Sequence, residues 1–121
     1  MQVGGKDIGL LYTVRARIAI AKLTGKHEIA DIMSLFKGNE EQQIDNLYKV
    51  ARILNHEYEL KRKLDKGASV DLNENQSILK REDLDTMLSV EFDELTDAVF
   101  RTLRGERTVE AVPSKKRTAK S

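Results

Sequence analysis

The sequence contains no cysteine, and no stretch of it is long and apolar enough to span a bilayer. The absence of cysteine excludes disulfides, thiolate metal sites and cysteine nucleophiles. Basic residues interrupt the N-terminal region, and no small-residue cleavage site follows an apolar run, so we expect no signal peptide. Together these absences predict a cytosolic protein that has no membrane partner.

Acidic residues are absent from the last nine positions, PSKKRTAKS, which carry four of the 21 basic residues. The other 17 basic residues are set against 20 acidic ones, so residues 1–112 have a net charge of about −3. A dedicated nucleic-acid-binding domain would carry a basic face on its folded part. We therefore do not expect the folded part to bind nucleic acid, and we expect residues 106–121 to form a disordered basic tail.

Only two histidines are present, His27 and His56, and they lie far apart in the chain. The fragment HEIAD, which begins at His27, resembles the zinc-protease sequence H-E-x-x-H, but its fifth residue is Asp31. The glycines around Lys6 do not have the spacing of a phosphate-binding loop. We therefore expect no catalytic residue, no metal and no cofactor.

Glycine marks the ends of the predicted helices. Four glycines follow segments with helical periodicity and have a Lys or Arg within the preceding three residues: Gly25, Gly38, Gly67 and Gly105. Glycine accepts the left-handed backbone conformation that ends many helices, and a cation in the last turn interacts favourably with the helix dipole. The sequence therefore predicts four helix ends in a chain about one domain long.

Apolar periodicity and capping residues predict where these helices begin. Thr13 and Ser89 are the expected caps of the first and last helices, and Asn39 with Gln42 forms a capping box before the longest one. The predicted helices span 13–23, 27–37, 39–66, 81–88 and 90–104, with a loop at 67–77. The fold class is thus mainly α, a single domain over residues 1–105 with four to five helices and a short N-terminal β-hairpin.

The first dozen residues have the pattern of a strand pair. Gln2–Val3, a Gly4–Gly5 turn and a second strand from Lys6 to Tyr12 predict the hairpin. A hairpin this short is marginally stable in water, so it must pack on the helices or pair with a strand of a partner.

Two surfaces are candidate partner-binding sites. One is the opening strand, with three residues that alternate onto one face: Ile8, Leu10 and Tyr12. The other is the wide apolar face of the longest helix, which includes Tyr48 and Tyr58. For both surfaces the alternative is ordinary core packing.

The loop after the longest helix partly resembles a calcium-binding EF-hand loop. Its oxygen-bearing residues fall at ligand spacing: Asp71, Asn73, Asn75, Ser77 and Glu82. Gln76, however, stands where the sharp turn of that loop needs glycine, and only two of the candidate ligands are charged. We therefore interpret the segment as a polar loop that caps the next helix, with a calcium-responsive module as the alternative.

The order of these features resembles the phage tail assembly chaperones, small proteins encoded just before the tape-measure protein. The resemblance covers residues 3–105. It rests on the opening GKDIGLLYTVRARIAIAKLTG, on the long-helix segment EEQQIDNLYKVARILNHEYEL, and on the polar loop and C-terminal helix pair that follow. It is a resemblance of pattern and order, without an invariant motif.

That resemblance implies a non-enzymatic role in the cytoplasm of the host bacterium. Such a chaperone would bind the tape-measure protein, the tail-tube protein or both, and keep them competent for assembly. It implies no catalytic residue. Exposed apolar faces would serve a homo-oligomer equally well.

A small helical regulatory or nucleic-acid-associated protein is the alternative function. Residues 26–54 contain helix–turn–helix material, but the second helix begins with Glu40 and Glu41 and continues with Asp45. These acids would face the phosphates at the end that enters the groove, which disfavours DNA binding.

Overall fold

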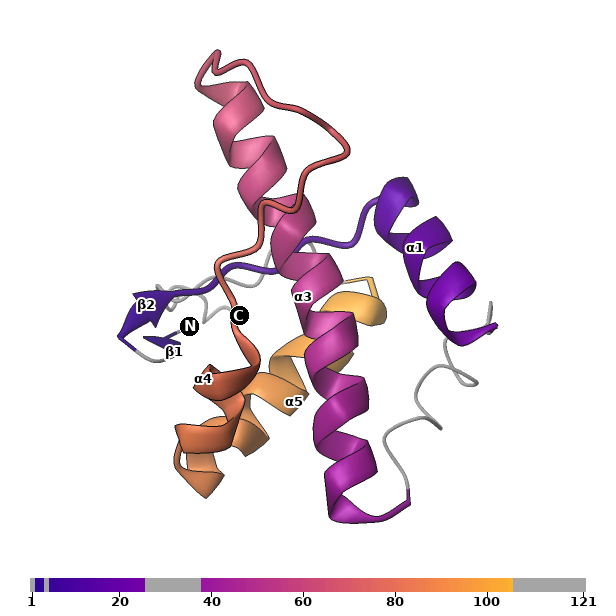
Figure 1. Ribbon diagram of the computed structural model, residues 1–121, viewed down its shortest axis with the longest axis vertical. Coiled ribbons are helices and arrows are strands. Elements are labelled where there is room, and N and C mark those ends of the chain that lie inside the picture. The colour runs from indigo at the N-terminus through magenta and orange to yellow at the C-terminus, as the bar shows by residue number, and fades with distance from the viewer. Residues whose placement is uncertain (1, 4, 26–37, 106–121) are drawn as a thin grey trace, which may run out of the picture.

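The computed structural model of the protein describes residues 2–3, 5–25 and 38–105, which form four helices and one two-stranded antiparallel hairpin (Figure 1). The elements are β1 (Gln2–Val3), β2 (Lys6–Asp7), α1 (Val14–Thr24), α3 (Glu40–Asp65), α4 (Arg81–Thr86) and α5 (Ser89–Leu103). The mainly α fold with a short hairpin is as predicted. The predicted helix at 27–37 and the predicted tail at 106–121 lie outside the described residues.

Helix α3 is the central packing element. Its first turn is closed by the predicted capping box, in which Asn39 Oδ1 accepts the N–H of Gln42 at 2.8 Å. Its buried apolar residues are Leu47, Val50, Ala51, Leu54 and Leu60. Because these recur at helical spacing over four turns, one continuous stripe of α3 faces the rest of the molecule.

The hairpin is shorter than predicted. Its pairs are Gln2 with Asp7 and Val3 with Lys6, and the second strand ends at Asp7 instead of Tyr12. Beyond it the chain stays extended and crosses α3, where the N–H of Leu11 bonds the carbonyl of Leu54 at 3.1 Å (Figure 1). The Leu11 N–H is thus bonded to α3, and the hairpin ladder ends at the pair of Gln2 with Asp7.

Helix α1 packs mainly against α3 through Ala16 and Ile20, both fully buried. Thr13 caps it as predicted, with Oγ1 accepting the N–H of Ala16 at 3.0 Å. Gly25 ends it in the left-handed conformation, at φ 72°.

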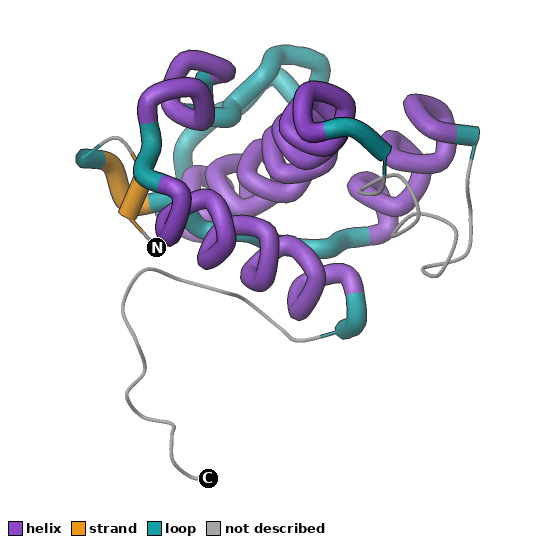
Figure 2. The backbone as a smooth tube through the Cα atoms, turned by 90° about the horizontal axis from the view of Figure 1, so that it is seen from below, coloured by secondary structure: helices purple, strands orange, loops and turns teal. Residues whose placement is uncertain are grey.

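Helix α4 contacts α3 on the side away from α1, and α5 crosses α3 obliquely, behind it in Figure 1 (Figures 1 and 2). Helix α4 ends at Thr86, two residues before its predicted end at residue 88. The expected cap of α5, Ser89, is instead its first helical residue. The cap is Leu88, whose N–H donates to the carboxylate of Glu91 at 2.8 Å.

One hydrophobic core joins all these parts. Its fully buried members come from the hairpin, the crossing segment and three helices, and include Val3, Ile8, Leu10, Ile20, Leu47, Leu54, Leu95, Val99 and Leu103. Among the described residues, no helix has the length and apolarity needed to cross a membrane.

Candidate functional site

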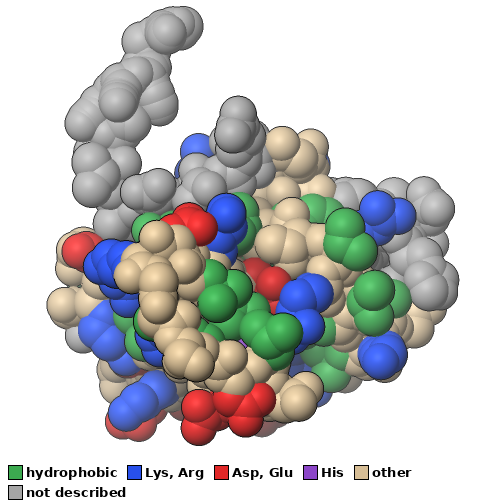
Figure 3. Space-filling view, turned by 90° about the horizontal axis from the view of Figure 1, so that it is seen from above, with side chains coloured by type: hydrophobic (Ala, Val, Ile, Leu, Met, Phe, Trp, Pro, Cys, Tyr) green, Lys and Arg blue, Asp and Glu red, His purple; other side chains and the backbone are tan. Residues whose placement is uncertain are grey.

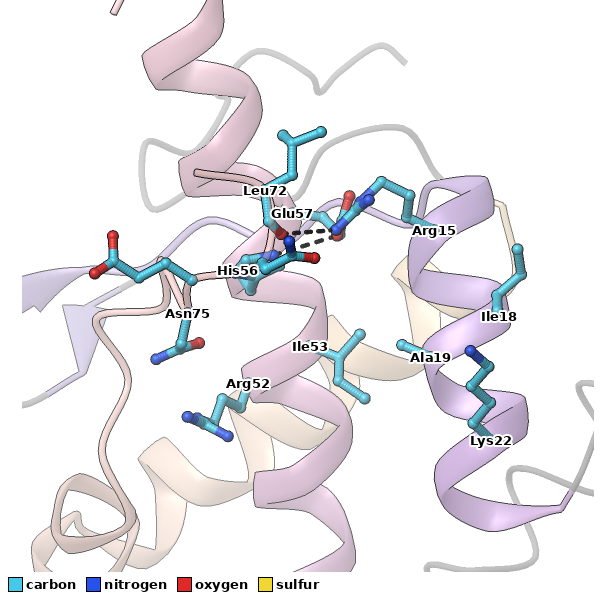
Figure 4. Close-up of a pocket in the computed structure, with 12 residues that line it drawn as sticks. Arg15, Ile18, Ala19, Lys22, Arg52, Ile53, His56, Glu57, Leu72 and Asn75 are labelled. Carbon is cyan, nitrogen blue, oxygen red and sulfur yellow. Dashed lines mark hydrogen bonds and ion pairs between the residues drawn. The ribbon is translucent and has the colours of Figure 1, made fainter. Parts of the chain in front are cut away.

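A cleft of about 470 Å³ lies between α1, α3 and the loop that follows α3 (Figure 4). Helix α1 contributes Arg15, Ile18, Ala19 and Lys22, helix α3 contributes Arg52, Ile53, His56 and Glu57, and the loop contributes Leu72 to Asn75. A second hollow of about 440 Å³ shares Ala19, Lys22, Arg52 and Ile53 and extends to Leu23, Tyr48 and Lys49. We call the two together the α1–α3 cleft.

At one end of the cleft, Glu57 joins α1 to α3. This carboxylate accepts the hydroxyl of Thr13 at 2.8 Å and the Nε–H of Arg15 at 3.4 Å. Arg15 also donates to the carbonyl of Leu72 at 3.1 Å, so it closes this end against the loop (Figure 4). Glu57 is buried, and its hydrogen bonds offset the cost of burying its charge.

His56 lies beside Glu57 and holds the loop. Its Nδ1 accepts the N–H of Gln76 at 2.8 Å, and its Nε2 lies 3.6 Å from the Glu57 carboxylate. Burial lowers the pKa of His56, the Glu57 carboxylate raises it, and Arg15 and Arg52 lower it further; the net shift is downward. The neutral imidazole suits the structure, because a protonated Nδ1 could not accept the Gln76 N–H.

The other end of the cleft is apolar and basic. Its described lining has the apolar side chains of Leu23, Tyr48 and Ile53, three cations and no acid. The cations, Lys22, Lys49 and Arg52, are exposed, and none forms an ion pair with another described residue. Viewed from above, exposed hydrophobic side chains lie among Lys and Arg on the described surface (Figure 3).

Ile8 and Leu10, predicted at a partner-binding edge, are both fully buried. The prediction allowed them either to anchor the opening segment or to meet a partner. In this conformation they anchor it, since they present no surface on which a partner could bind.

Three tyrosines were also predicted to meet a partner, and they have separate environments. Tyr12 is half-buried against the core, and burial raises its pKa more than the nearby Arg17 lowers it. The ring of Tyr58 lies directly over Gly9. Tyr48 lines the α1–α3 cleft, so it alone of the three belongs to the candidate site.

The residues of the alternative calcium loop mostly bond to the protein itself. Asp71 Oδ1 accepts the N–H of Asn73 at 2.9 Å, and Asn75 Oδ1 accepts the N–H of Ser77 at 3.2 Å. The Ser77 hydroxyl donates to Asn55 at 2.7 Å, and Glu82 lies in α4. Within the described ranges, no group of three or more His, Asp or Glu residues is placed to hold a metal ion.

Sequence reasoning missed Asn55, the buried residue that joins the opening segment to this loop. Its Nδ2 donates to the carbonyl of Gly9 at 2.9 Å, and its Oδ1 accepts from Ser77 Oγ and from the N–H of Ile78. A signal was present, since Asn55 follows Ala51 by four residues and so stands on the apolar stripe of α3. A polar side chain at such a position is expected to bond buried backbone groups.

In comparison with known proteins, the chain matches no family model, no curated protein and no solved structure.

Proposed function

We propose that the chain is a non-enzymatic phage tail assembly chaperone. It binds the tape-measure protein, the tail-tube protein or both, in the cytoplasm of the host bacterium, and keeps them competent for assembly. The proposal combines the resemblance in the order of sequence features with one structural observation, the exposed apolar side chains of α1.

That observation carries the proposal. Val14 is 70% exposed, Ile18 52% and Leu23 47%, although α1 already buries Ala16 and Ile20 on α3. Exposed apolar side chains gathered on one helix are typical of a surface that binds another protein. A chaperone for a long, apolar, helix-prone protein needs such a surface and needs no catalytic group.

A regulatory or nucleic-acid-associated protein is the second candidate, and the charge of α1 favours it. This helix carries Arg15, Arg17 and Lys22 and no acidic residue. A phosphate backbone makes no favourable contact with the exposed apolar side chains between these cations, so we rank this candidate second. Binding to duplex DNA that weakens steeply with salt would favour it over the chaperone.

Co-expression with a tape-measure fragment tests the proposal. We expect more soluble fragment in the presence of the chain than with an empty vector, and co-elution of the two proteins. Unchanged solubility without co-elution would contradict the proposed function.

A further inference from the structure

The α1–α3 cleft has a chemistry that selects one kind of partner. We propose that it binds an amphipathic helix of another protein, one whose apolar row is flanked by acidic side chains. Under the proposed function, on which this assignment rests, the helix belongs to the assembling tail protein.

The shape of the site suits a helix. The cleft runs beside α1, which has 11 residues and is therefore about 16 Å long at 1.5 Å per residue. Ala19 and Ile53 face each other across the gap between α1 and α3 (Figure 4). A partner helix of about three turns would place an i, i+4, i+7 row of apolar side chains along this length.

The charge of the cleft favours a partner helix that has acidic side chains beside its apolar row. Lys22 and Arg52 line both hollows, and Lys49 lines the second. Glu74 and Glu57 are the acids of the described lining, and Glu57 is already bonded by Thr13 and Arg15. Acidic side chains beside the apolar row would therefore meet cations that have no ion-pair partner among the described residues.

A second copy of the chain matches this site less well. The exposed apolar residues near its acidic helix α5 are Leu88 and Val90, both at the start of that helix. Farther along α5 the exposed side chains are acidic ones, Asp93, Glu94 and Asp97. One apolar turn would fill only part of a cleft that follows the whole of α1.

A peptide titration of the full chain tests the proposal. The probe is a synthetic 18-residue helix with leucine at i, i+3, i+4 and i+7 and glutamate beside the leucine row. Its control is the same peptide with lysine for glutamate. We expect the glutamate peptide to bind about tenfold tighter than the lysine peptide. Backbone amide shifts should change in α1 and in residues 48–53.

A charge-reversed variant, Lys22→Glu with Arg52→Glu, should bind the glutamate peptide about tenfold more weakly. The matched control, Lys61→Glu with Lys66→Glu, changes the charge equally at exposed positions near the far end of α3. It should bind within about twofold of the unaltered chain.

Equal binding of both peptides, or an equal loss of affinity in the control variant, would overturn the proposal. Amide shifts confined to the hairpin or to α5 would also overturn it. So would displacement of the bound peptide by a second copy of the chain or by duplex DNA. If the peptide binds as expected while co-expression has no effect on the tape-measure fragment, only the chaperone function fails. If co-expression succeeds while the peptide binds elsewhere, only the cleft assignment fails.

Discussion

Asn55 is the polar centre of the molecule, because one side chain bonds the opening segment and the loop after α3. Both contacts are between segments far apart in sequence, 46 residues for Gly9 and 22 for Ser77. The side chain is fully buried, so water cannot replace the bonds if it is lost.

Replacing Asn55 with Ala should lower the free energy of unfolding by about 2–4 kcal/mol, since it leaves the Gly9 carbonyl and the Ile78 N–H without a partner. Urea denaturation followed by circular dichroism measures the change. Asn73→Ala is the matched control, because Asn73 is exposed, and it should change stability by less than about 0.5 kcal/mol. Equal effects of the two substitutions would contradict the role assigned to Asn55.

Gly9 is required by the ring of Tyr58. A Cβ at position 9 would overlap the ring of Tyr58. The φ of Gly9 is not positive, so position 9 requires glycine because of this steric contact and not because of backbone strain. Gly9→Ala should cost about 1–3 kcal/mol in urea denaturation. In a Tyr58→Ala background the same substitution should cost clearly less. An equal cost in both backgrounds would show that the contact is not the cause.

His56 should make stability depend on pH. Its pKa is lowered in the folded chain, mainly by burial, so the unfolded chain binds its proton more readily. The contribution of His56 to the free energy of unfolding is therefore fully present above the ordinary histidine pKa of 6.5. It is lost as the pH decreases through that value toward the lower pKa of the folded chain. Urea midpoints at pH 7.5 and 5.5 measure this loss. His56→Gln should lose less stability over the same interval, and an identical loss would exclude His56 as the cause.

One hydroxyl has two roles at the beginning of helix α1. Thr13 Oγ1 caps α1 and also donates to Glu57 on α3, so the same atom starts the helix and attaches it. This arrangement positions the exposed apolar side chains of α1 beside the cleft.

Thr13→Ala should destabilise the protein by about 1–2 kcal/mol, since a capping bond and a bond to a buried carboxylate are lost together. Hydrogen exchange should show faster exchange in α1 than in α5. Thr13→Ser retains the hydroxyl and should restore most of the protection. Uniformly faster exchange in all helices would contradict a role local to α1.

The sequence predicted the helices better than the hairpin. Capping residues and apolar spacing are local signals, and they placed Thr13 before α1 and the capping box before α3 correctly. The second strand was predicted to reach Tyr12, but it ends at Asp7, and farther along the Leu11 N–H bonds the Leu54 carbonyl. No local pattern reveals a bond between residues 43 positions apart.

Much of the candidate site could also not be predicted from the sequence. The two hollows between α1 and α3 bring together residues from three separate segments, and their charge emerges only from the fold, since residues 1–112 are acidic overall. Tyr48 was a predicted partner residue and lies in the cleft. Ile8 and Leu10 alternate as a strand face would, but the alternation did not reveal that both are buried.

Among the described residues, exposed large apolar side chains gather in two places, on α1 and at the start of α5, and Leu64 and Leu72 are also exposed. In the first place, Leu23 lines the basic end of the cleft and Ile18 lines its other hollow, whereas the second place adjoins acidic side chains. A partner that needs both apolar and cationic contacts should therefore depend on α1 and not on the start of α5.

The most direct test is the soluble amount of a co-expressed tape-measure fragment, compared among three forms of the chain. They are the unaltered chain, Val14→Ser with Ile18→Ser, and Leu88→Ser with Val90→Ser. All four substituted side chains are more than half exposed, so both variants should fold. We predict that the unaltered chain and the Leu88/Val90 variant raise the soluble amount and co-elute with the fragment, whereas the Val14/Ile18 variant does not. An equal soluble amount with all three forms and with an empty vector would contradict the account.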